Sequence, residues 1–135
     1  MKFSSILKVA ALGLCVVGSS LIGLASWGQQ SPKGVKVSGA DLQAWLSKNF
    51  VIAGENLANG CVYMIVGEAS RRIQFYSCPD GKYETVEGTQ RVVGDTLCTT
   101  WPYAEERCRE FYKIGENRYE QWTKGAHTAT VYILK

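Results

Sequence analysis

The chain has 135 residues and a formal net charge of +3, from 15 Lys and Arg against 12 Asp and Glu. A balance so close to neutral does not favour nucleic acid or an anionic surface as a partner. The chain has one histidine, His127, and five cysteines without a Cys-x-x-Cys pair, which argues against zinc fingers, zinc ribbons and thioredoxin-like redox sites. We therefore expect no metal site, no cofactor and no nucleic-acid partner.

The N-terminal segment has the features of a secretory signal peptide. Basic residues at the start are followed by an uncharged run over residues 9–32, with an apolar centre and small residues near Ala25. This pattern predicts cleavage after Ala25 or Ser26, so that residues 1–25 form a signal peptide and the protein is periplasmic or secreted, without a stable membrane span. The alternative is an uncleaved anchor, because the uncharged run is long enough to cross a bilayer.

Cleavage would also change the cysteine count. It removes Cys15 and leaves an even set, which in an exported chain predicts a disulfide framework. The four remaining cysteines are Cys61, Cys78, Cys98 and Cys108.

The remaining chain is long enough for one domain. Residues 26–37 are rich in Gly, Ser, Gln and Pro and predict a flexible leader, and residues 38–135 predict a single disulfide-stapled β-rich domain. A helix is expected over about residues 40–48, with Ser38 as its N-cap. Its apolar face would consist of Leu42, Trp45 and Leu46 and would pack against the faces that carry Phe75 and Phe111.

After the helix, the pattern changes to short β-type segments separated by turn residues. No long amphipathic helix interrupts them, so an antiparallel meander is expected. The fold class is therefore α+β, mainly β: one N-terminal helix on a curved meander or partly closed barrel of six to eight strands, with two disulfides. The predicted strands are Cys61–Val66, Arg72–Ser77, Tyr83–Glu87, Gln90–Val93, Thr96–Trp101, Arg107–Lys113, Arg118–Thr123 and Thr128–Leu134.

The first two strands form a hairpin that brings two cysteines into register. If Cys61 faces Cys78, then Tyr63 faces Tyr76, and the opposite face gathers apolar side chains that we expect to form the core. These apolar residues are Val62, Met64, Val66, Ile73 and Phe75.

A second hairpin has the same property. If Cys98 faces Cys108, then Leu97 lies opposite Arg109, and residues 101–107 form the loop. Both hairpins favour the local pairing Cys61–Cys78 and Cys98–Cys108, while the sequence alone leaves the other two connectivities open.

The sequence contains no recognisable catalytic set. It has no Gly-x-Ser-x-Gly, no phosphate-binding glycine loop and no His-Glu-x-x-His, so no catalytic residue is assigned. Most aromatic residues are expected in the core, but Trp101 and Tyr103 would be displayed on a loop closed by a disulfide. We expect a non-enzymatic binding or envelope-associated role with an envelope or extracellular ligand or protein, the alternative being a hydrolytic enzyme without a recognisable motif.

The order of motifs from Ile73 to Tyr119 resembles a family of small exported bacterial proteins of unknown function. The matching features are an aromatic pair before an Asp-Gly turn, a Leu-Cys-x-x-Trp segment, a second cysteine about ten residues on and a glycine turn flanked by tyrosines. The pair Cys61 and Cys78 lies outside that pattern. The resemblance implies an exported β domain and no established reaction.

The segment "NRYEQWTKGAHTATVY" is similar to the closing motif of the periplasmic C-type lysozyme inhibitors. That similarity implies that Lys124, in a tight turn, contacts the carboxylates of a lysozyme, with Trp122 anchoring the turn. The Ser-Gly-x-x-Tyr motif of those inhibitors is replaced here by "REFYKIG". Trp122 and Lys124 thus join the candidate binding residues, and lysozyme inhibition is an alternative function.

Overall fold

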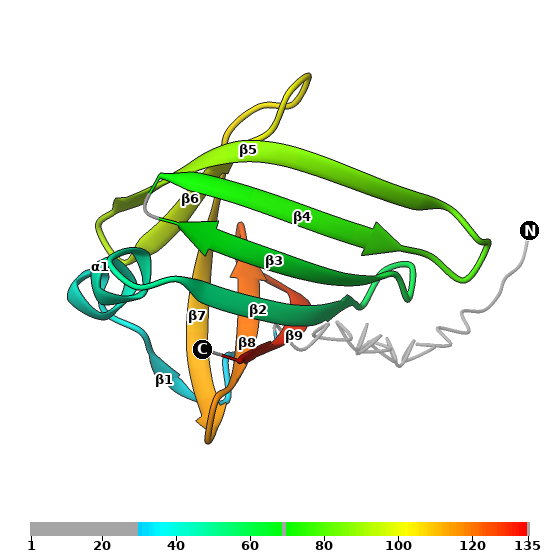
Figure 1. The fold of residues 1–135 in the computed structure, drawn as a ribbon. Helices are drawn as coiled ribbons and strands as arrows, with labels where there is room; N and C mark the ends of the chain where they lie inside the picture. Colours follow the sequence, from blue (N-terminus) through cyan, green and yellow to red (C-terminus); the bar gives the residue numbers. More distant parts are fainter. Residues whose placement is uncertain (1–29, 69, 135) are drawn as a thin grey trace, which may run out of the picture.

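The part of the protein that the structure describes is a closed antiparallel β-barrel with one helix and one additional strand (Figure 1). The computed structural model describes residues 30–68 and 70–134, so the predicted signal peptide lies outside the described residues. Consecutive barrel strands pair as neighbours, and β9 returns to pair with β2. The barrel strands are β2 Phe50–Asn56, β3 Val62–Glu68, β4 Arg71–Ser77, β5 Tyr83–Val93, β6 Thr96–Thr100, β7 Arg107–Gly115, β8 Arg118–Thr123 and β9 Ala126–Ile133. The fold class expected from the sequence is confirmed, and the sheet closes completely.

The two predicted disulfides and their registers are confirmed. Cys61 is bonded to Cys78 and Cys98 to Cys108. Across β3 and β4, Tyr63 lies opposite Tyr76, as the cysteine pairing required. Both disulfides are therefore local, and each joins the two sides of a single hairpin.

Three strands differ from the prediction. β2 was not predicted, although its apolar start belongs to the core. The short strand β1, Val35–Lys36, lies within the segment expected as a leader and pairs with β7. The predicted turn at Gly88 is instead the interior of the single strand β5, where the absence of a side chain leaves room for the Thr100 carbonyl oxygen and the Trp101 ring.

The helix α1, Gly39–Leu46, lies at one end of the barrel (Figure 1). Its N-cap Ser38 accepts a hydrogen bond from the backbone N–H of Asp41 at 3.2 Å, and Gly39 N–H donates to Asp95 in the β5–β6 turn. These contacts fix the helix against the turns at that end.

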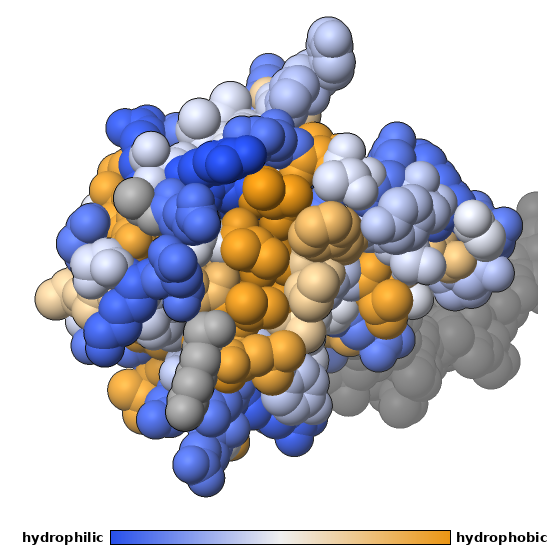
Figure 2. All heavy atoms as spheres, in the orientation of Figure 1, coloured by the Kyte–Doolittle hydropathy of each residue, from blue (hydrophilic) through white to orange (hydrophobic). Residues whose placement is uncertain are grey.

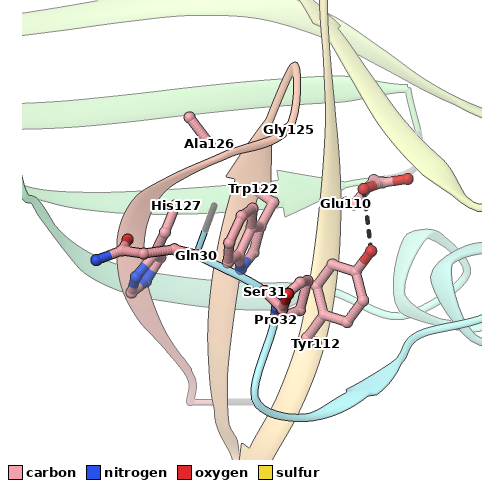
Figure 3. A pocket seen from close by; sticks show the side chains of 9 residues that line it. All are labelled: Gln30, Ser31, Pro32, Glu110, Tyr112, Trp122, Gly125, Ala126 and His127. Carbon is pink, nitrogen blue, oxygen red and sulfur yellow. Dashed lines mark hydrogen bonds between the residues drawn. The ribbon is translucent and has the colours of Figure 1, made fainter. Parts of the chain in front are cut away.

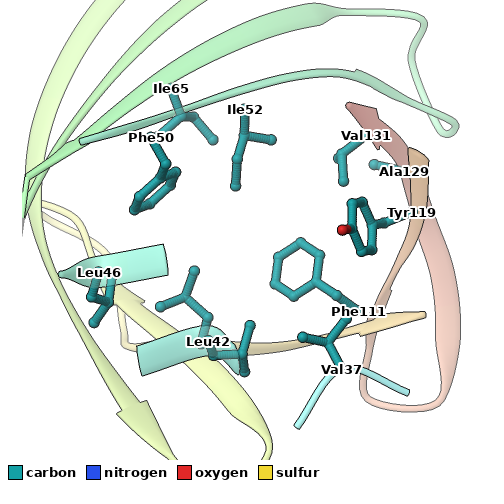
Figure 4. Close-up of a cluster of buried hydrophobic side chains, with 11 residues drawn as sticks. Val37, Leu42, Leu46, Phe50, Ile52, Ile65, Phe111, Tyr119, Ala129 and Val131 are labelled. Atoms are coloured by element: carbon teal, nitrogen blue, oxygen red, sulfur yellow. The ribbon is translucent and has the colours of Figure 1, made fainter. Parts of the chain in front are cut away.

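An apolar cluster fills the half of the barrel next to α1 (Figure 4). The predicted contact between the helix and Phe111 is confirmed: the Trp45 ring meets the rings of Phe111 and Tyr119 edge-on, with centroids 5.5 and 5.2 Å away. The cluster comprises Val37, Leu42, Leu46, Phe50, Ile52, Ile65, Leu97, Phe111, Tyr119, Ala129 and Val131.

The core face predicted for β3 and β4 is wrong, because it points outward, and the predicted packing of the helix against the face that carries Phe75 is wrong for the same reason. Val62 and Met64 are 53% and 43% exposed, and Phe75 shares their face, whereas Ile65 is fully buried. The inward face carries Gly67, where an added Cβ would lie 2.2 Å from the Phe50 ring. Figure 2 shows the resulting apolar patch on the outer surface over β2, β3 and β4.

Candidate ligand-binding cavity

The barrel interior away from α1 is lined by polar and aromatic side chains and contains a cavity of about 270 Å³. We call it the arginine cavity. Its lining comes from β2, β3, β4, β7, β8 and the β6–β7 loop, and consists of Asn56, Tyr63, Arg72, Gln74, Tyr76, Trp101, Ala104, Arg107, Arg109 and Gln121.

The arginine cavity continues into a second hollow of about 470 Å³, which shares Tyr63, Arg107, Arg109 and two further lining residues with it. This hollow reaches the β2–β3 turn and the β8–β9 hairpin. Because α1 contacts the β5–β6 turn at the other ends of antiparallel strands, the hollow opens at the end of the barrel opposite the helix. Small-molecule sites have volumes of about 300–1,000 Å³, so the second hollow lies within this range and the arginine cavity alone lies just below it.

Arg72 lies at the base of the arginine cavity and is only 1% exposed. One terminal nitrogen donates to Thr99 Oγ1 at 2.8 Å, and the guanidinium lies 5.5 Å from the centre of the Trp101 ring. Its Nε is buried and has no hydrogen-bond partner. Burial, together with repulsion from Arg109, lowers the pKa of Arg72 to about 9, so the side chain stays cationic at neutral pH.

Arg109 contributes a second cation to the same cavity. One of its terminal nitrogens is buried without a hydrogen-bond partner. Burial lowers the pKa of Arg109, the nearby Tyr63 acts in the opposite direction, and Arg107 lowers it further. None of the charged groups that shift the pKa of Arg72 or Arg109 is a carboxylate, and no Asp or Glu is among the described residues that line the cavity.

Two glycines position the aromatic walls of the cavity. A Cβ on Gly54 would lie 2.7 Å from the Tyr63 ring, and one on Gly88 would lie 2.6 Å from the Trp101 ring. Both rings therefore lie directly against the barrel backbone. Burial raises the pKa of Tyr63, and its hydroxyl donates to Gln121 Oε1 at 3.4 Å.

The four binding residues predicted from the sequence do not form one site. Trp101 lines the arginine cavity, whereas Tyr103 is 108% exposed on the β6–β7 loop. Trp122 is buried on another part of the barrel wall, and Lys124 is exposed at the tip of the β8–β9 hairpin. The structure thus brings only Trp101 to the arginine cavity.

Trp122 belongs to a separate pocket of about 560 Å³ on the outer side of β8, shown in Figure 3. Its ring stacks on His127 at 5.6 Å, and its Nε1 donates to Glu120 at 3.0 Å. The same carboxylate accepts a hydrogen bond from the backbone N–H of Lys33 at 3.2 Å. The hydrogen bond from Lys33 therefore holds the start of the described chain against the barrel at this pocket. Within the pocket, His127 stacks on Trp122.

Although burial opposes it, hydrogen bonds from Trp122 and from the Lys33 backbone hold the pKa of Glu120 below its usual range. The charges of His127 and Lys33 act in the same direction. Glu120 is 4% exposed, so these contacts stabilise a buried carboxylate.

Sequence reasoning missed the two central arginines. Arg71 and Arg72 are adjacent in β4, and successive side chains of a strand point to opposite faces. Arg71 therefore lies on the outer face, where it pairs with Glu87, and Arg72 points inward. For Arg109 a signal was available, because the predicted register placed it opposite Leu97. Opposite residues share a face of the sheet, and Leu97 is buried, so Arg109 also points inward.

Within the described residues, one grouping of potential metal ligands occurs, formed by Cys98, Glu106 and Cys108. Its two sulfurs are joined in a disulfide and are not thiolate ligands. In the same part of the chain, no helix is long and apolar enough to cross a membrane.

Comparison of the chain with protein-family models, with curated proteins and with solved structures returned no match.

Proposed function

We propose that the protein is an exported, non-enzymatic binding protein that holds a small ligand at the open end of its barrel. The observation that carries this proposal is the arginine cavity itself: polar groups of Arg72 and Arg109 are buried at its wall without a partner in the protein. Buried polar groups are ordinarily satisfied, and the exceptions are concentrated at functional sites.

The lining of the cavity favours binding over catalysis. Among its described lining residues there is no histidine, free cysteine or carboxylate, which are the commonest general acids, bases and nucleophiles; Tyr63 and Tyr76 supply hydroxyl groups, and His127 lines the adjoining hollow. The arginines and the aromatic rings of Tyr63 and Trp101 instead provide hydrogen-bond donors and flat contact surfaces. Such groups orient a ligand through hydrogen bonds and stacking.

The test is native mass spectrometry of the protein recovered with both disulfides formed, with and without added small metabolites. We expect a small molecule to be retained by the wild type and released chemically unchanged. Ala104→Trp, a change on the loop that lines the cavity, should fill the opening and reduce retention. Retention that is equal in the Ala104→Trp variant, or no retention of any compound, would contradict the proposal, and a chemically altered product would indicate an enzyme.

One observation favours lysozyme inhibition as a second candidate function. Lys124 and Gly125 both have positive φ, 50° and 76°, and form the two-residue turn between Thr123 and Ala126. The lysine is therefore presented at the tip of a hairpin, as the similarity to the lysozyme inhibitors requires.

The second candidate is tested by a cell-wall lysis assay with C-type lysozyme and excess protein. If it is correct, Lys124→Ala should weaken inhibition at least about tenfold, because a charge-assisted contact with the active-site carboxylates is lost. Lys82→Ala, at another exposed turn, should leave inhibition unchanged. Undiminished lysis at about micromolar wild-type protein would rule this function out.

A further inference from the structure

We propose that the ligand of the arginine cavity is a small organic oxyanion, whose carboxylate or phosphate group lies between Arg72 and Arg109. This inference rests on the proposed function and adds the chemical class of the ligand. It follows from the donors and charges of the described residues around the cavity.

The first argument is charge. Arg72, Arg109 and Arg107 line one cavity, and no described lining residue carries a negative charge. Burying a cation without a counter-ion is unfavourable, and two such cations in one cavity also repel each other. An anion between them removes both penalties at once, whereas a neutral ligand removes neither.

The second argument is geometry. The guanidinium of Arg72 is held in place by its hydrogen bond to Thr99 and its contact with Trp101, which leaves Nε as a donor without a partner. Arg109 has an unpartnered terminal nitrogen in the same cavity. Two guanidinium donors in one cavity, that of Arg72 held in place, match the several lone pairs of a carboxylate or phosphate.

The third argument concerns the body of the ligand. Tyr63, Tyr76 and Trp101 also line the cavity, and their rings provide flat surfaces for carbon atoms beside the charged end. Its volume of about 270 Å³ is far larger than an isolated inorganic ion needs. We therefore expect an anion with a small organic body, such as an aromatic or short-chain acid.

The experiment is isothermal titration calorimetry near neutral pH in a zwitterionic buffer of low ionic strength. The probes are benzoate, phenyl phosphate, inorganic phosphate and the neutral analogue benzamide, each tested up to about 10 mM. We expect at least one of the two aryl anions to bind at least about tenfold more tightly than benzamide and than inorganic phosphate. The comparison of benzoate with phenyl phosphate distinguishes a carboxylate ligand from a phosphate ligand.

The variants assign the binding to the two arginines. Arg72→Met and Arg109→Met should each weaken binding of the preferred aryl anion by at least about tenfold, and Arg72→Lys should retain part of it. Arg71→Met is the matched control, because Arg71 is the adjacent residue on the outer face and should leave the affinity unchanged.

The outcomes separate this inference from the proposed function. Binding of benzamide as tightly as the aryl anions, sensitive to Ala104→Trp, would overturn the oxyanion inference and leave the binding function standing. Aryl anions that bind equally well to Arg72→Met and Arg109→Met would overturn it as well. If no probe binds while another small molecule is retained in the native mass spectra, the oxyanion inference also fails and the binding function stands.

Discussion

Replacing Arg72 by methionine should make the ligand-free protein more stable. The guanidinium is 1% exposed, has no carboxylate partner and shares its cavity with Arg109. Methionine matches the arginine side chain as far as Nε and carries no charge, so it removes the desolvation penalty together with the contacts that the guanidinium makes. The net change in stability therefore compares the cost of burying the charge with the value of those contacts.

The magnitude follows from the pKa of Arg72, which burial lowers to about 9. Because one pKa unit corresponds to about 1.4 kcal/mol, this lowering disfavours the charged folded state by roughly 4–5 kcal/mol. The hydrogen bond to Thr99 and the contact with Trp101 are lost in the variant, at a cost of roughly 2–3 kcal/mol. The net gain expected for Arg72→Met is about 1–3 kcal/mol, or roughly 4–14 °C in Tm for a domain of this size.

The assay is thermal and urea denaturation followed by circular dichroism near neutral pH, in a buffer without carboxylates, phosphate or sulfate. Arg71→Met, which removes only an exposed ion pair with Glu87, should change stability by less than about 1 kcal/mol. Adding Thr99→Val to Arg72→Met should recover part of the free energy lost at the unpaired hydroxyl.

A loss of more than about 1 kcal/mol on Arg72→Met, with Arg71→Met neutral, would refute this reasoning. It would mean that the contacts of the guanidinium stabilise the folded state by more than the burial of its charge destabilises it. We expect the opposite result, a variant that is more stable and no longer binds aryl anions. This combination is typical of a binding site whose functional residue lowers the stability of the folded protein.

Three further predictions concern the scaffold. Gly88→Ala should destabilise the protein by about 1–3 kcal/mol and alter tryptophan fluorescence, because its Cβ would lie 2.4 Å from the Thr100 carbonyl oxygen and 2.6 Å from the Trp101 ring. Gly115→Ala, with its nearest neighbour at 3.7 Å, should be nearly neutral. Replacing Cys61 and Cys78 by alanine opens a loop of 17 residues and should lower the free energy of unfolding in urea by about 3 kcal/mol. Since the folded-state pKa of Glu120 is lowered, its contribution to stability is present above about pH 5 and is lost as pH falls through the folded pKa. Glu120→Gln should therefore show a shallower loss of stability than the wild type in denaturation curves recorded between about pH 5 and 3, and an equally steep loss would contradict the assignment.

The local structure of this protein is encoded in short segments of its sequence. Ser38 and the apolar spacing behind it determine the helix, and the turn residues between β-type segments determine most of the hairpins. The two disulfides follow from the register of single hairpins, because each cysteine pair lies symmetrically about its own turn. These features depend on contacts between residues close in the chain, and single-sequence reasoning reaches them.

The closure of the barrel and the direction of its faces depend on contacts between distant residues. The pairing of β2 with β9 joins segments that are about 75 residues apart in the sequence, so no local sequence pattern predicts it. The hairpin register determines which side chains of β3 share a face, but only packing against Phe50 and α1 decides that Ile65 points inward and Met64 outward. The arginine cavity also depends on distant contacts. Alternation along β4 and β7 points Arg72 and Arg109 to the inner face of the sheet, and closure of the sheet makes both line one cavity.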